Sequence, residues 1–143
     1  IITDAVFNQY KELCDKDNIE FEISGKLPEN FNMAETDLCV LLSNLISNAY
    51  EAALKCEEDR RKISVEIRNS DEDIFIDVSN SVNGEVVFKN GLPVTDKQDR
   101  KNHGFGVENI LEVVERNGGY IEWKQLDKGR FTAEIMLNSQ GNI

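Results

Sequence analysis

The sequence lacks a long apolar run, an internal repeat and any low-complexity segment, and it has one histidine among 143 residues. Without an apolar stretch of about 20 residues, it has no predicted membrane span, and no secretory signal is visible at its start. Its three cysteines, Cys14, Cys39 and Cys56, are an odd number without the spacing of a metal site. We therefore expect structural thiols in a reducing compartment. Because the chain begins Ile-Ile-Thr, we also expect a domain cut from a longer protein, such as a membrane protein.

Positive charge is scarce as well, because 27 acidic residues outnumber 16 lysines and arginines and give a net charge of −11. Such a field repels the phosphates of nucleic acids and anionic lipids. We therefore expect no nucleic-acid partner and no direct membrane contact by this domain. A bound polyphosphate would need a local site made of backbone amides, a metal ion or a few lysines.

The hydrophobic pattern is that of one α/β domain covering residues 1–143. It predicts helices over 3–16, over about 35–56 and through 107–114, and strands over 19–23, 62–68, 73–79, 120–125 and 130–137. The strand 19–23 alternates and is expected to bury one face, and Thr36 or Asp37 is expected to cap the second helix. The natural packing is a two-layer α/β sandwich, with the helices on one face of a mixed sheet of about five strands.

Two polar segments fall outside this pattern. Residues 80–102 contain glycines and a proline and are long for a connection, which is typical of a functional or disordered loop. Residues 138–143 are predicted to form a polar tail. In neither segment does the sequence predict a helix or strand.

A row of polar residues runs along the second helix. Asn44, Asn48, Glu51 and Lys55 fall within an arc of about 60°, beside the apolar face that includes Leu41, Leu45 and Ala49. A half-exposed polar stripe on an amphipathic helix would look the same. The alternative is a cleft at the rim of the core, where an asparagine oxygen is a good ligand for Mg²⁺.

The segment HGFGVENI, residues 103–110, bears on this choice. Gly104 and Gly106 are expected where a loop enters a helix, so that the backbone and the first free N–H groups can approach a phosphate. A G-x-G sequence alone is more often a structural turn. His103, as a lone histidine, is more typical of a loop or cap residue than of a catalyst.

Together, NLISNAYEA and, about fifty residues later, HGFGVENI resemble the ATP-binding domain of the histidine-kinase, gyrase, Hsp90 and MutL superfamily. The resemblance covers nearly the whole chain and implies the Bergerat fold, with Mg²⁺ and ATP between the asparagine helix and the loop-helix element. It makes Asn48 the magnesium ligand, places Asn44 beside the phosphates, and implies that both asparagines are catalytic residues. The rest of the implied nucleotide site comprises Asn80, Lys101, His103, Gly104, Phe105, Gly106 and Val107.

Two positions depart from that superfamily. The segment FIDVSN ends at Asn80, where most members have an aspartate that reads adenine. The asparagine oxygen can still accept from the adenine amino group and its NH₂ can serve a ring nitrogen, but without a charge-assisted bond we expect weaker binding. Glu51 stands where many sensor kinases have a cation, which disfavours a phosphate contact there without a metal.

The segments DLCVLLSNLISNAYEA and NGLPVTDKQDRKNHGFGVENI further resemble the branch of sensor histidine kinases of peptide quorum sensing. This resemblance implies a cytoplasmic catalytic domain of a membrane-anchored bacterial receptor, homodimeric as a full-length protein. The domain would transfer the γ-phosphoryl group of ATP to a histidine on an upstream dimerisation domain, from which it passes to a response regulator. Residues 1–16 would lie near the junction with that domain, and residues 80–102 would form an ATP lid. The alternatives are a degenerate nucleotide-binding regulatory module and an anti-sigma-type serine kinase.

Overall fold

The structure is a computed structural model that describes residues 2–29, 31–94 and 97–138, with Ile2 and residues 97–105 described by their backbone alone. The helices are α1 (Ile2–Lys16), α2 (Glu35–Leu54) and α3 (Lys97–Arg116), with a short 3₁₀ helix at Glu58–Arg60. The strands are β1 (Glu20–Ser24), β2 (Lys62–Ser70), β3 (Asp73–Ser81), β4 (Phe88–Lys89), β5 (Leu92–Pro93), β6 (Tyr120–Asp127) and β7 (Arg130–Asn138).

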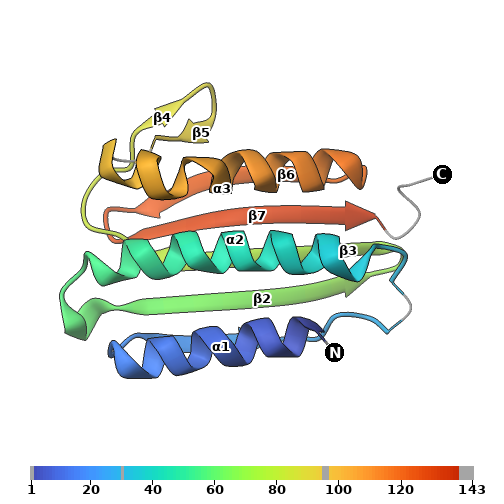
Figure 1. Cartoon of the computed structure of the whole chain (residues 1–143), viewed down its shortest axis with the longest axis horizontal. Coiled ribbons are helices and arrows are strands. Elements are labelled where there is room, and N and C mark those ends of the chain that lie inside the picture. The colour runs from blue at the N-terminus through green and yellow to red at the C-terminus, as the bar shows by residue number, and fades with distance from the viewer. Residues whose placement is uncertain (1, 30, 95–96, 139–143) are drawn as a thin grey trace.

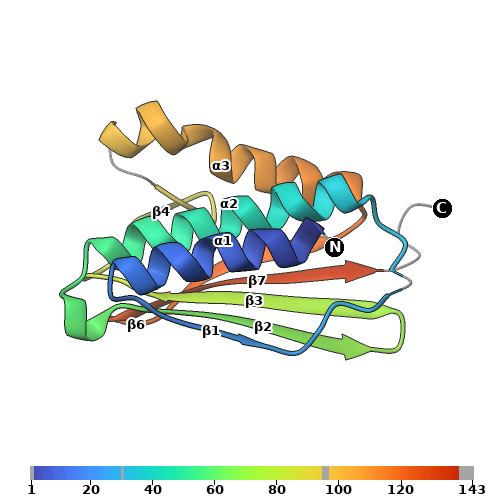
Figure 2. The ribbon, with the colours of Figure 1, turned by 60° about the horizontal axis from the view of Figure 1, so that its bottom comes forward.

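Within the described residues, five strands form one sheet in the order β1-β2-β3-β7-β6, and β4 and β5 form a separate hairpin. β1 is parallel to β2, and the other neighbours in the large sheet are antiparallel. The three α-helices lie side by side over one face of this sheet (Figures 1 and 2). The predicted two-layer sandwich with a mixed sheet is therefore confirmed.

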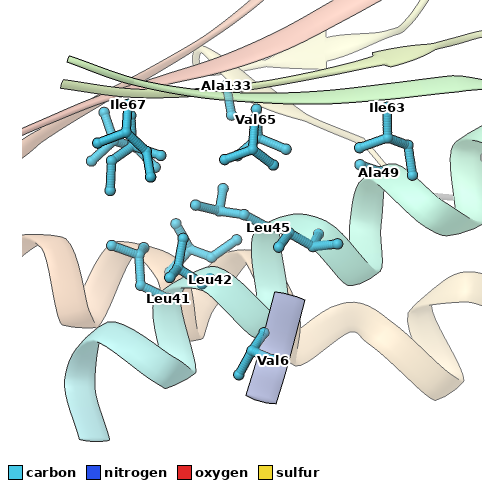
Figure 3. Packing of buried hydrophobic residues seen from close by; sticks show 14 of the residues in the cluster. Val6, Leu41, Leu42, Leu45, Ala49, Ile63, Val65, Ile67 and Ala133 are labelled. Carbon is cyan, nitrogen blue, oxygen red and sulfur yellow. The ribbon is translucent and has the colours of Figure 1, made fainter. Parts of the chain in front are cut away.

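The core lies between α2 and the central strands (Figure 3). Leu41, Leu42 and Leu45 of α2 point toward the sheet, where Val65 and Ile67 of β2 face them, and all five are nearly or completely buried. Burying a side chain of this size contributes roughly 1.5–3 kcal/mol relative to leaving it exposed. Because this face of α2 is fixed in the core, its neighbouring polar row is fixed at the rim.

Arg61 joins the ends of two helices. Its guanidinium donates to the carbonyl oxygens of Asp17, Leu54 and Cys56 at 2.8, 3.1 and 3.0 Å. The last carbonyls of a helix lack partners within the helix, and a cation there is also favoured by the helix dipole. Arg61 thereby fixes the C-terminal end of α2 beside the start of β2.

The start of α2 differs from the prediction. Its N-cap is Ala34, which makes no side-chain capping bond, so the expected cap at Thr36 or Asp37 was wrong. Asp37 instead accepts hydrogen bonds from the side chains of Arg116, at 2.7 Å, and Asn117, at 3.1 Å, at the end of α3. This tertiary contact ties α2 to α3, and it replaces the local bond that the sequence suggested.

The Asp37 contact is expected to make stability depend on pH. Hydrogen bonds, first from Arg116 and then from Asn117, lower the pKa of the Asp37 carboxyl in the folded state. The contribution is then present above the unfolded pKa of about 4 and is lost as the pH falls through the lower folded value. Asp37→Asn should lower the melting temperature by a few degrees at pH 7, since exposed pairs contribute little, and by less in acid. Thermal melts of both proteins across pH 2–7 measure this, and Glu112→Gln, which removes an exposed partner of Arg116, is the control. A difference that persists unchanged in acid would contradict the role of the carboxylate.

Two further expectations were partly wrong. β1 lies at the edge of the sheet and buries little, since Phe21 is half-buried and Ile23 is 39% exposed. The predicted loop 80–102 includes the end of β3, the β4–β5 hairpin and the first turns of α3. The helix extends this far because residues 97–103 contain neither proline nor glycine to stop it. Beyond position 138, the predicted polar tail lies outside the described residues.

Candidate functional site

A cleft of about 370 Å³ opens beside the C-terminal half of α2. α2 forms one side, and the end of β3 with the segment 82–87 forms the other. The floor comes from the sheet and includes Trp123 of β6 and Phe131 of β7. The volume falls within the usual range for small-molecule sites, about 300–1,000 Å³.

The polar row of α2 borders this cleft. Asn48, Glu51 and Lys55 all line it, as the cleft alternative predicted. Asn44 lies one turn earlier and is outside the lining, and its amide donates to the carbonyl of Val40 in its own helix at 2.7 Å. The amide of Asn48 makes no hydrogen bond within the described part of the chain, so its oxygen and nitrogen are available to a ligand.

α3 approaches this row at Gly106. A Cβ built on Gly106 would lie 3.3 Å from Oδ1 of Asn48 and 3.6 Å from Oδ1 of Asn44. The glycine therefore lets the two helices come close where the asparagines face α3. Val107, the next residue, lines the cleft.

This position corrects the expectation for the glycine segment. α3 begins at Lys97, so Gly104 and Gly106 lie about two turns inside the helix and not at its entrance. The backbone N–H groups of an interior turn are already used by the helix, so they are not free for a phosphate here. In this structure Gly106 serves close packing of α3 against the asparagine row.

Asn80 lies at the far end of the cleft. It is 4% exposed, it lines the cleft, and its Nδ2 donates to the carbonyl of Ser81 at 3.0 Å. Antiparallel pairing with Ile63 of β2 and Phe131 of β7 fixes its backbone. The predicted adenine-reading residue is therefore a buried amide that faces the same cleft as Asn48.

The side of the cleft near Asn80 is mostly apolar. Val78, Val82, Val86 and Phe131 line it, and such surface suits a flat aromatic group better than a phosphate. The charged and polar side chains of α2 lie on the opposite side. The arrangement can hold a ligand that has an aromatic end and a polar, metal-binding end.

The β4–β5 hairpin was not predicted, although the sequence carries its signal. Asn90 and Gly91 both have positive φ, 55° and 77°, as a two-residue hairpin turn requires. The strand pairs are Phe88 with Pro93 and Lys89 with Leu92. The Asn-Gly pair between apolar residues is the feature that sequence reasoning could have used.

The donor set fits a metal ion that arrives with its ligand. Among the residues the structure describes, no group of three or more His, Cys, Asp or Glu side chains is placed to hold a metal. Mg²⁺ usually keeps several waters and needs one or two protein groups beside phosphates. A single hard oxygen such as Oδ1 of Asn48, without a partner in the described chain, suits that kind of binding.

For four predicted site residues the structure gives the backbone position in α3 and nothing of the surroundings. The side chains of Lys101, His103 and Phe105, and the surroundings of Gly104, fall in the stretch described by its backbone alone.

Within the described ranges, no helix is long and apolar enough to cross a membrane.

Residues 33–138 match the family described as the GHKL domain. Over 98 residues, 64% of this chain, the sequence is 26% identical to the sensor histidine kinase DpiB of Escherichia coli (strain K12). The matched part is 18% of that kinase, so the chain spans less than a fifth of the length of this curated relative.

The fold is similar to that of solved histidine kinase domains. One structure of the catalytic domain of histidine kinase ThkA has a TM-score of 0.75 at 20% identity, covering 95% of this chain and 89% of that one. The histidine kinase AdeS of Acinetobacter baumannii has a TM-score of 0.68 at 12% identity, covering 97% of this chain and 64% of that one. At these identities the likeness concerns the fold.

Proposed function

The chain belongs to the GHKL domain family, as a domain of the histidine kinase type, and we propose that it binds Mg-ATP in the cleft beside α2 as the catalytic domain of a sensor kinase. The observation that carries this proposal is the position of Asn48 and Asn80 in the lining of one cleft. They come from a helix and a strand far apart in sequence, and each offers an amide to one end of a nucleotide.

In this proposal the adenine lies against the apolar side of the cleft and Oδ1 of Asn80 accepts from its amino group. The phosphates point toward Asn48 and the nearby turn of α3 at Gly106. Asn48 would hold Mg²⁺ through Oδ1, and the metal would supply neutralisation of the phosphate charge. The domain's net charge of −11 disfavours a bare polyphosphate and so favours that neutralisation.

The residues of this chain bind and orient the nucleotide and contribute no strong base. Phosphoryl transfer depends mainly on positioning and charge neutralisation, so none is required in the domain. The γ-phosphoryl group passes to a histidine of an upstream dimerisation domain, with release of ADP, and then to a response regulator. The full-length protein is a homodimeric, membrane-anchored sensor kinase of the peptide quorum-sensing branch. In it, residues 80–102 form the ATP lid.

The position of the only tryptophan provides the test. Trp123 is 7% exposed and lines the cleft, so a ligand there should change its fluorescence. We expect a saturable change on addition of Mg-ATP and a weaker one when EDTA removes the metal. Calorimetry should give the same affinity, and GTP should compete poorly.

A flat response in both measurements at millimolar nucleotide would contradict the proposal. That result would favour a regulatory module that has lost nucleotide binding, the alternative that the uncharged Asn80 suggests. Free tryptophan amide titrated in parallel corrects for absorption by the nucleotide.

A further inference from the structure

One side chain on β6 binds the backbone of the segment that forms the apolar side of the cleft. Oε1 of Gln125 accepts from the backbone N–H of Val86 at 2.7 Å, and Nε2 of Gln125 donates to the carbonyl of Gly84 at 2.8 Å. One amide thus pairs with an N–H and a C=O two residues apart. This is what a neighbouring β-strand would offer to that segment.

The sheet places Gln125 where it can do this. Its partner on β7 is Phe131, which lines the cleft, and Trp123 lies two residues earlier on the same face of β6. A register shift follows between Gln125 and Asp127, where β6 ends. Bulges often redirect side chains at the ends of strands, and this one lies beside the point where the segment after β3 crosses the sheet.

Residues 82–88, which we call the cleft wall, are attached to the sheet at two further places. At the start, the N–H of Val82 donates to the carbonyl of Gly129 at 3.0 Å, and Arg60 donates to the carbonyl of Val82 at 3.3 Å. At the end, the ring of Phe88 stacks on Phe131 with centroids 6.0 Å apart. Figure 1 shows this connection from β3 to β4 passing the ends of β7 and β6.

Gln125 holds the stretch between those two attachments. This stretch supplies Asn83, Glu85, Val86 and Val87 to the lining of the cleft. Val87 is 66% exposed, so little apolar packing keeps this part of the wall in place. Gly84 has a φ of 86°, and a Cβ built on it would have no atom within 4 Å, so this turn faces open space. The two bonds to Gln125 therefore tie residues 84–86 to the sheet. Val87 is held separately, because its carbonyl accepts from the N–H of Val94 at 2.8 Å.

We propose that Gln125 is a positioning residue for nucleotide binding, which holds the cleft wall in its binding position before the nucleotide arrives. The inference rests on the proposed function and names a residue that touches the wall, with no contact to the nucleotide. A protein whose binding-competent form is only partly populated binds more weakly by that fraction. Ordering the wall on binding would have the same cost in affinity.

Two substitutions separate the two bonds. Gln125→Ala removes both bonds. We expect it to weaken Mg-ATP binding about tenfold, because the net free energy of each hydrogen bond corresponds to a factor of about three or more in Kd. Gln125→Glu keeps an acceptor for Val86, loses the donor to Gly84 and brings a carboxylate oxygen near that carbonyl, so its loss in affinity should be at least about threefold. Leu126→Ala, at an exposed neighbouring position of β6, is the matched control and should bind like the parent.

The ligand series distinguishes the wall from the phosphate side. Calorimetry with Mg-ATP and with adenosine should show the same factor of loss for both ligands in Gln125→Ala, since the wall faces the base. Asn48→Ala should weaken Mg-ATP alone. Equal affinities of the folded parent and Gln125→Ala for both ligands would overturn the inference. If the alanine variant does not fold, equal affinities of the parent and Gln125→Glu would overturn it instead.

A second measurement needs no ligand. Hydrogen exchange at the backbone amide of Val86 in the free protein should be at least about tenfold faster in Gln125→Ala than in Leu126→Ala. Unchanged exchange at Val86 would overturn the restraint itself. If the parent bound neither Mg-ATP nor adenosine, the proposed function and the role of Gln125 in it would both be wrong. If the parent bound both ligands and the Gln125 variants bound them equally well, only the role of Gln125 would be wrong.

Discussion

Replacing Asn48 with alanine is expected to raise the Kd for Mg-ATP by at least about 100-fold while leaving the domain folded, since second-shell changes alone weaken metal sites 10–100-fold. The side chain lines the cleft, faces α3 at Gly106 and makes no hydrogen bond within the described residues. Its removal therefore takes a metal ligand from the bound state and no bond from the free one. The measurement is calorimetry with Mg-ATP, repeated with EDTA, where parent and variant should become alike.

Two matched variants on α2 sharpen this result. Ser47→Ala changes the neighbouring residue, which is outside the cleft lining, and should bind like the parent. Asn44→Ala removes the bond to the carbonyl of Val40 and should weaken binding less than Asn48→Ala, because Asn44 is also outside the lining. A melting-temperature shift with Mg-ATP that survives in Asn48→Ala would contradict the metal role. In the full-length protein, the same substitution should abolish labelling of the acceptor histidine by γ-labelled ATP.

Much of the fold was predictable because its elements carry strong local patterns. Buried residues occur at every second position over most of β2 and β3, and the apolar face of α2 repeats over five turns, so both layers could be assigned from periodicity. Where elements interact mainly through tertiary contacts, prediction failed. Asp37 looked like a cap from its neighbours along the chain, but its partner Arg116 is 79 residues away.

The site was predictable in its residue types and less so in its geometry. Asn48 and Asn80 do line one cleft, and the polar row does lie at the rim of the core. Gly106 was expected to expose backbone N–H groups to a phosphate, whereas it allows α3 to approach Asn44 and Asn48. That difference follows from where α3 begins, because residues 97–103 permit a helical extension that no apolar repeat marks. The bonds of Gln125 to the cleft wall join residues about 40 positions apart, and no spacing in the sequence reveals them.

The amide of Asn80 also acquires a constraint that the sequence did not indicate. Because its Nδ2 donates to the carbonyl of Ser81, one N–H is already used, and Oδ1 is the atom left to accept from adenine. A carboxylate at this position would lose that bond and place a negative charge beside the Ser81 carbonyl, at a site that is 4% exposed. We therefore expect Asn80→Asp to lower the stability of the free domain, although its folded form should bind ATP at least as tightly as the parent.

Asn80→Leu should weaken ATP binding about 10–100-fold, because the amino edge of a buried base would then lack a partner. Calorimetry on protein shown to be folded by its melting curve measures this, since the leucine also removes the bond to Ser81. Asn83→Leu is the comparison: this asparagine also lines the cleft but is exposed, so it should cost much less. The preference for ATP over GTP should fall in Asn80→Leu and stay unchanged in Asn83→Leu, since the asparagine oxygen repels the carbonyl that GTP presents in place of the amino group. Equal ATP affinity and equal ATP preference in parent and Asn80→Leu would instead make Asn80 a strand-ending residue whose amide serves only the turn at Ser81.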